Sequence, residues 1–236
     1  MGLLPAGRFV DTGGSILIHA FGALFGVAAA VSLTRGAEQE IAIESDDTSD
    51  RFSLLGSMVL WVFWPSFCAA LVPAAAIPAT AVNVILALCA STLATYGASL
   101  LLRGKVLPAD IANAALAGGV AIGSSCDRVP PALAFVIGLA AGLLSTAGYA
   151  LVQERLQKAL GLVDSCGVLY LHGLPGLLGG LTTLIGVVGS DAGTQLGGIA
   201  IAITLAVTSG LLVGRLIAFT GQRSQPYSDA EEFLVD

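Results

Sequence analysis

The chain has 236 residues, of which 56% are hydrophobic and only 11% are charged, and its formal net charge is −6. Soluble domains carry about 25% charged residues, so this composition excludes a water-soluble globular protein, and it also excludes a disordered or collagen-like chain. The negative net charge speaks against nucleic acid as a partner. We therefore expect an all-α polytopic membrane protein.

Long apolar stretches without charge predict where the chain crosses the membrane, because a helix needs about 20 apolar residues to span the hydrocarbon core. The stretch 52–102 is long enough for two helices and is divided near Pro73 and Pro78. We expect about seven membrane helices, near residues 13–34, 53–72, 81–102, 110–126, 131–152, 166–188 and 194–220. Residues 1–220 then form the membrane domain, and residues 221–236 form a polar cytoplasmic tail.

Lysine and arginine collect on one side of these predicted helices. Eight of the ten lie in the 35–52 and 103–110 loops, near 155–158 or close to the C-terminus, and only Arg8 and Arg128 lie on the other side. Short cytoplasmic loops are enriched in these residues. We therefore expect an integral protein of the plasma or inner membrane, with its N-terminus outside and its C-terminus in the cytoplasm.

A sixteen-residue pattern occurs twice and contains the only two histidines, His19 and His172. Residues 11–26 read DTGGSILIHAFGALFG and residues 164–179 read DSCGVLYLHGLPGLLG, and ten of the sixteen positions are identical or similar. Each copy begins with an aspartate eight residues before its histidine. A lone intramembrane histidine can simply bond a neighbouring helix, but two in one repeated frame favour a functional pathway, because buried ionisable groups are costly.

The two copies lie on the first and sixth predicted helices, which cross the membrane in opposite directions. An inverted repeat of this kind has its functional site near the midplane, between its two units. Eight helical residues span about 12 Å, so an aspartate at the interface puts its histidine near the bilayer centre. We expect the two rings within hydrogen-bonding distance. In this division 13–34 ends a first repeat, 53–188 is the second repeat and 194–220 is a final helix.

Several segments resemble the Rh (Rhesus) branch of the ammonium transporter family. They are the two repeat copies, SLLGSMVLWVFWPSFCAAL at 53–71, DIANAALAGGVAIG at 110–123 and GLLSTAGYALV at 142–152. The resemblance implies a partial inverted-repeat ammonium-transporter fold in the lipid bilayer, assembled as a homotrimer with one pore per protomer. It also implies transport of ammonium or ammonia, with carbon dioxide as a second gas, and neither enzymatic activity nor a cofactor.

The resemblance assigns conduction to three residues and a structural, vestibular role to two: His19, His172 and Phe67, and Asp11 and Asp164. A narrow apolar lumen around a twin-histidine centre would pass neutral ammonia, because a cation at the bilayer centre is strongly disfavoured. One departure from the family is Cys68, where asparagine is usual. We interpret the four cysteines as small core residues, neither bridged nor bound to metal.

Two alternatives stay open. Four helices of the first repeat are missing from this sequence, so the chain could be a truncated, non-conducting Rh-like paralogue that assembles with or regulates a full-length partner. By the same reasoning, a pore would need the missing helices, a relative or a second copy to close it. An intramembrane metalloenzyme would need His19, His172 and Cys166 as ligands, but the sequence has no HExxH motif or paired His/Cys spacing.

Overall fold

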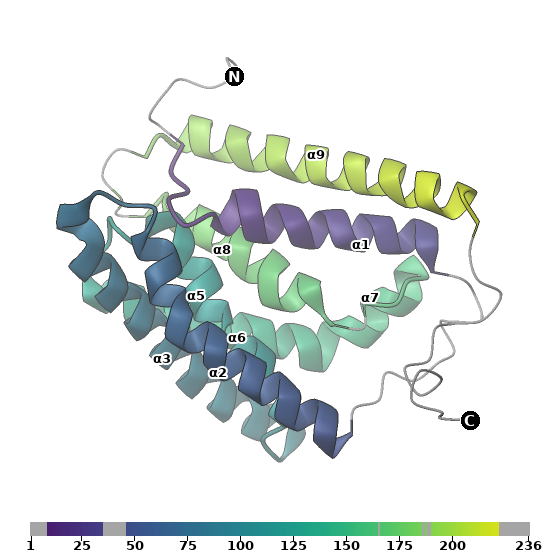
Figure 1. Cartoon of the computed structure of the whole chain (residues 1–236), viewed down its shortest axis with the longest axis horizontal. Helices are drawn as coiled ribbons and strands as arrows, with labels where there is room; N and C mark the ends of the chain where they lie inside the picture. The colour runs from purple at the N-terminus through teal and green to yellow at the C-terminus, as the bar shows by residue number, and fades with distance from the viewer. Residues whose placement is uncertain (1–8, 35–45, 165, 186, 188–189, 222–236) are drawn as a thin grey trace, which may run out of the picture.

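The computed structural model describes residues 9–34, 46–164, 166–185, 187 and 190–221, and these residues contain helices and no strands (Figure 1). The predicted all-α fold class is therefore confirmed. Five helical segments in the described part are long and apolar enough to cross a membrane: Ser15–Leu33, Asp47–Ala69, Ala74–Arg103, Pro131–Leu160 and Ala192–Phe219.

These five segments are not all uniform α-helices. Their elements are the π-helical turn η1 (Ser15–Ala20) with α1 (Phe21–Leu33), α2 (Asp47–Ala69), the 3₁₀ turn η3 (Ala74–Ala76) with α3 (Ile77–Arg103), α6 (Pro131–Ala147) with the π-helical turn η5 (Gly148–Val152) and α7 (Gln153–Leu160), and α9 (Ala192–Phe219). Two of the wide π-helical turns, which often mark functional sites, thus lie inside membrane-length segments.

The other two predicted helices, at 110–126 and 166–188, are short and interrupted. Their elements are α4 (Pro108–Ala114), α5 (Ala117–Ile122) and the 3₁₀ turn η4 (Gly123–Ser125), and the π-helical turn η6 (Leu169–Gly173) with α8 (Leu174–Thr182). Between α4 and α5 the amide of Leu116 donates to the carbonyl of Asn113, three residues back. Such tighter bonds end an α-helical ladder, and apolar length alone does not reveal them.

Two helix boundaries differ from the prediction for local reasons. Helix α2 begins well before residue 53, because the Asp46 carboxylate accepts hydrogen bonds from the amides of Thr48 (2.8 Å) and Ser49 (2.7 Å). These bonds, above all that from Ser49, lower the pKa of Asp46. Helix α3 includes Pro78 in its first turn, where the missing N–H has no helical partner to lose.

The helices form two groups with the interrupted segments between them. Helices α1 and α9 run side by side along one edge, while α2, α3 and α6 form the opposite side, with α3 packed along α6 (Figure 1). Helix α8 contacts η1 on one side and α5 and α6 on the other. The repeat motifs therefore meet between the two groups of helices.

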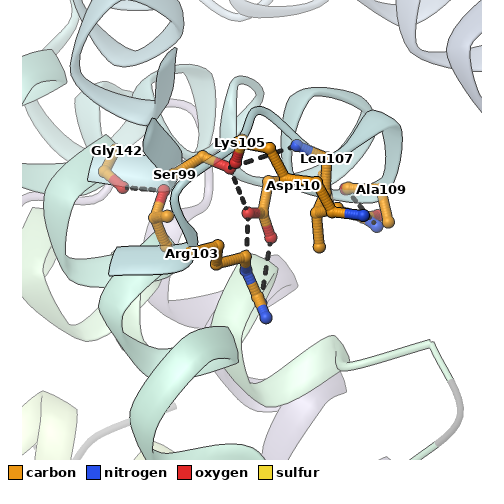
Figure 2. Close-up of polar contacts among 9 residues, drawn as sticks. Ser99, Arg103, Lys105, Leu107, Ala109, Asp110 and Gly142 are labelled. Atoms are coloured by element: carbon orange, nitrogen blue, oxygen red, sulfur yellow. Dashed lines mark hydrogen bonds and ion pairs between the residues drawn. The ribbon is translucent and has the colours of Figure 1, made fainter. Parts of the chain in front are cut away.

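A polar cluster fixes the turn from α3 to α4, in the predicted cytoplasmic loop (Figure 2). The Arg103 guanidinium donates two bonds to the carboxylate of Asp110, at 2.9 and 3.2 Å, and the Ser99 hydroxyl donates a third at 2.7 Å. The Asp110 side chain is almost fully buried. Since a buried carboxylate is stable only when it is paired and bonded, these contacts hold the entry to α4 in one position.

The cysteines only partly match their interpretation as core residues. Cys68 and Cys126 are buried in the main core with Trp64, but Cys89 is half-buried. Cys166 is exposed, which makes the prediction wrong for that residue. It lies in the turn before η6, where the backbone bends rather than packing as a helix. None of the four forms a disulfide.

Candidate functional site

The two histidine rings are in contact. The Nδ1 atoms of His19 and His172 lie 3.2 Å apart, and the ring planes differ by only 6°. The ring centroids are 5.2 Å apart, so the closest approach of the two nearly parallel rings is between their nitrogens. The predicted contact is therefore present, while its place at the bilayer midplane stays a prediction.

The two motif-bearing helices run antiparallel, as expected for an inverted repeat. Gly173 approaches Ala23, Gly176 approaches Ala20, and Gly180 approaches Ile16, so numbers rise along one segment as they fall along the other. A side chain at Gly176 would overlap the Ser15 carbonyl oxygen. The close crossing that brings the histidines together therefore requires glycine here.

The first motif copy starts with a turn that Asp11 stabilises. The Asp11 carboxylate accepts hydrogen bonds from the amides of Ile16 (3.0 Å) and Leu17 (2.8 Å). Gly14 has a φ of 76°, a conformation that glycine adopts without strain. The His19 amide then donates to the Gly14 carbonyl, five residues back, which defines the π-helical turn.

The second copy repeats this arrangement. The Asp164 carboxylate accepts from the amides of Val168 (3.0 Å) and Leu169 (3.3 Å), and Gly167 has a φ of 64°. His172 follows in the π-helical turn η6. In both copies the aspartate satisfies amides at a helix start that have no helical partner, so its carboxylate fixes the turn that carries the histidine.

Trp64 belongs to the site, although the sequence did not single it out. Its indole stacks on the His19 imidazole, with centroids 5.5 Å apart and an interplanar angle of 20°. Two buried ring nitrogens, Nε2 of His19 and Nε1 of Trp64, have no hydrogen-bond partner within the described residues. The only sequence signal was that Trp64 begins the WPSF segment containing Phe67; an aromatic residue on an apolar helix otherwise looks like core.

An open cavity of about 210 Å³ adjoins the histidine pair. Its lining residues are Ile18, His19, Gly22, Ala23, Val168 and His172. Phe67 is not among them and is 42% exposed on α2, so the structure does not bring it to the rings. Within the described residues, no three histidine, cysteine or acidic side chains cluster closely enough to hold a metal ion.

Comparisons with known proteins agree with this architecture. Residues 1–226 match the model of the Ammonium Transporter Family. The chain is 39% identical to Ammonium transporter Rh type A of Bos taurus over 236 residues, covering 95% of this chain and 55% of that protein. It is 41% identical to the Rh type B protein of Pan troglodytes over 177 residues, covering 72% of this chain and 39% of that protein.

Solved structures give the same result. Rh50 of Nitrosomonas europaea, of the Rhesus protein family of channels, superposes with a TM-score of 0.92 at 53% identity, over 96% of this chain and 60% of that chain. A Sensor Amt Protein shares the fold at 24% identity, with a TM-score of 0.73 over 91% of this chain and 55% of that chain. The chain thus spans about half the length of the curated relatives it matches. It is an integral membrane protein that belongs to the Rh branch of the ammonium transporter family.

Proposed function

We propose that this chain forms part of an ammonium channel in which neutral ammonia passes the His19–His172 pair. The observation that carries the proposal is the Nδ1–Nδ1 distance of 3.2 Å between the only two histidines of the sequence. Two nitrogens of the same kind can approach this closely only if one donates a proton to the other. One ring therefore donates at Nδ1 and the other accepts there.

The consequence for a passing molecule follows from the tautomers. The ring that accepts at Nδ1 carries its proton on Nε2, whereas the neutral ring that donates at Nδ1 has a bare Nε2. The pair thus offers one outward donor and one outward acceptor. Ammonia is itself both a donor and an acceptor, and the buried, unpartnered Nε2 of His19 is a suitable contact for it.

The remaining predicted residues have supporting roles in this proposal. Asp11 and Asp164 are structural, since their carboxylates are occupied by backbone amides rather than directed at the cavity. Phe67 lies one turn after Trp64 on α2 and is proposed as a pore aromatic, on the strength of the family resemblance. Ammonium must lose its proton before it enters the apolar lumen, because a charge there is strongly disfavoured.

We also propose the predicted repeat division, with 13–34 ending a first unit, 53–188 as the second unit and 194–220 as the final helix. The antiparallel contact of the two motifs supports it. The distribution of lysine and arginine supports an external N-terminus, a cytoplasmic tail at 221–236 and location in the plasma or inner membrane. A homotrimer and carbon dioxide as a second gas are proposed by family resemblance only.

One wall of the site is open within the described residues. Leu17 and Ile18, beside His19, are 58% and 50% exposed, and Gly22 has no atom within 4 Å of where a side chain would begin. Polar ring edges that face lipid are costly. We propose that further helices of a first repeat unit cover this wall and that conduction requires them.

The experiment uses a chimera, because Rh50 of Nitrosomonas europaea is longer and 53% identical. Residues 1–236 replace their matching region in Rh50, and ammonia entry into proteoliposomes is followed by the internal pH rise. We expect flux from the chimera, a loss of at least about tenfold in His19→Ala and His172→Ala, and no loss in Leu101→Ala, which changes an exposed side chain.

The other outcomes separate the alternatives. Full flux in the alanine variants would contradict the twin-histidine centre. A folded chimera without flux would favour the non-conducting paralogue. Histidine-dependent flux from residues 1–236 alone would show that the open wall needs no further helices.

A further inference from the structure

The π-helical turn η5 packs against η6 and the turn directly before it through a reciprocal pair of tyrosines and glycines. The Tyr149 ring lies where a side chain on Gly167 would be, and the Tyr170 ring lies where a side chain on Gly148 would be. The two rings are 5.4 Å apart between centroids, at an angle of 52°. Because each aromatic ring needs the other turn's glycine, the two turns fit in a single relative position.

The Tyr149 hydroxyl adds a directional contact to this packing. It lies 2.9 Å from the carbonyl oxygen of Gly167 and 3.2 Å from that of Cys166, and donates its proton to this pair. The Gly167 carbonyl also accepts from the amides of Tyr170 and Leu171, at 2.9 and 3.2 Å. Tyr149 thus bonds the carbonyl on which the turn carrying His172 is built.

The first motif copy has no such tyrosine in the described residues and is held differently. Its turn pairs with the 3₁₀ turn η4 through backbone bonds, from the Gly13 amide to the Gly123 carbonyl (2.7 Å) and from the Thr12 amide to the Ser124 carbonyl (3.3 Å). The Ser124 hydroxyl also donates to Asp11 at 2.6 Å. Each histidine therefore depends on a separate supporting element.

We propose that Tyr149 is a positioning residue for His172. Its ring and hydroxyl fix the turn from Asp164 to Gly167, and so set the distance and angle at which His172 meets His19. Tyr149 does not line the cavity beside the histidines, so it acts through His172 and not on the conducted molecule. This inference rests on the proposed twin-histidine function.

Tyr149→Phe tests the hydroxyl, and Tyr170→Phe is the matched control in the same ring pair, because the Tyr170 hydroxyl makes no bond within the described residues. The readout is ¹⁵N NMR of the histidine-labelled full chain in lipid nanodiscs, where only two residues give signals. We expect Tyr149→Phe to shift the His172 Nδ1 resonance and to weaken the ¹⁵N–¹⁵N contact between the rings. Tyr170→Phe should leave both unchanged.

A second readout separates positioning from general packing. In the Rh50 chimera, Tyr149→Phe should lower ammonia flux about fivefold, while the loss of one hydrogen bond should lower the melting temperature by only a few degrees. An unchanged ring contact in Tyr149→Phe would overturn the inference while leaving the twin-histidine proposal intact. Absence of the contact in the unsubstituted protein would overturn both.

Discussion

The two copies of the histidine motif share their local geometry but differ in their surroundings. Both combine an aspartate that accepts backbone amides, a glycine with positive φ and a π-helical turn. At equivalent positions, however, Leu17 and Ile18 are exposed, whereas Tyr170 and Leu171 are only 1% and 7% exposed. The presentation of the histidine therefore comes from the motif itself, and its covering comes from neighbouring elements.

This difference separates two kinds of constraint. Bonds within 11–19 and 164–172 orient each ring, so they must be kept whatever lies around them. Contacts such as the Tyr149 bond to Gly167 or the Gly123 bond to Gly13 anchor each turn to the rest of the fold. Variants that affect one copy at a time should reveal which constraint limits stability.

The largest effect is expected where the copies touch. Gly176→Val would force a side chain into the Ser15 carbonyl and the Ala20 backbone, which cannot move without separating the two motifs. We expect a loss of about 3 kcal/mol or more in the free energy of unfolding. Gly22→Ala is the control on α1, because no atom lies within 4 Å of where its side chain would begin; it should change the free energy of unfolding by less than about 0.5 kcal/mol. Thermal unfolding in detergent, followed by size-exclusion chromatography, measures both; equal melting temperatures would contradict the close crossing.

Gln195 on α9 connects the two copies from outside. Its buried amide accepts from the Val10 amide (2.8 Å) and donates to the carbonyls of Val10 (3.0 Å) and Gly180 (3.2 Å). Gln195→Leu would leave both backbone groups of Val10 buried without partners, at a cost of about 2–3 kcal/mol. Thr204→Val, on an exposed position of the same helix, is the control. Unfolding in denaturant compares them, and equal midpoints would show that Val10 finds other partners.

Equivalent positions in the two copies give a direct comparison. Leu171→Ala removes a buried side chain from the main core and should cost about 2 kcal/mol. Ile18→Ala, one residue before the other histidine, should cost less than about 0.5 kcal/mol in residues 1–236, because Ile18 is exposed there. In the Rh50 chimera we expect the Ile18→Ala cost to rise, if added helices cover this side. If Ile18→Ala lowers the free energy of unfolding equally in both backgrounds, the proposal that helices of a first repeat unit cover this wall is contradicted.

Among the four substitutions that remove a specific contact, Ser124→Ala should have the smallest effect. Ser124→Ala removes one bond to Asp11, while the carboxylate keeps its bonds to the amides of Ile16 and Leu17. We expect a loss of about 1 kcal/mol in the free energy of unfolding. The ¹⁵N resonances of His19 should shift, and those of His172 should not. Equal changes at both histidines would show that the two supports are coupled, contrary to the comparison above.

The sequence allowed the histidine pair to be predicted because a repeated, ungapped pattern carries more information than any single residue. His19 and His172 are the only histidines in the sequence, and their equal distance from the motif aspartates on oppositely directed helices allowed them to meet near the bilayer centre. Long charge-free stretches were equally informative about the five membrane-length helices, because charge is the strongest barrier to burial in lipid.

The parts that could not be predicted depend on contacts between distant segments. Trp64 looked like any aromatic residue on an apolar helix, and only its stacking on His19 identifies it. The interruption between α4 and α5 arises from backbone bonds that hydropathy does not encode. Likewise, the bond from Tyr149 to Gly167 joins residues that are eighteen positions apart and have no shared motif.

The π-helical turns have a consequence for how the gene can change in length. Each histidine lies five residues after its positive-φ glycine, and the wide turn accommodates that spacing. A π-helical turn is an α-helical turn with one extra residue, so deletion of one codon between Gly14 and His19 would convert it into a regular α-helix and leave the imidazole in nearly the same direction. Insertion of one codon in the same interval would instead turn the imidazole by about 100° around the helix axis, away from His172. A one-residue deletion in this interval should therefore be tolerated more readily than a one-residue insertion.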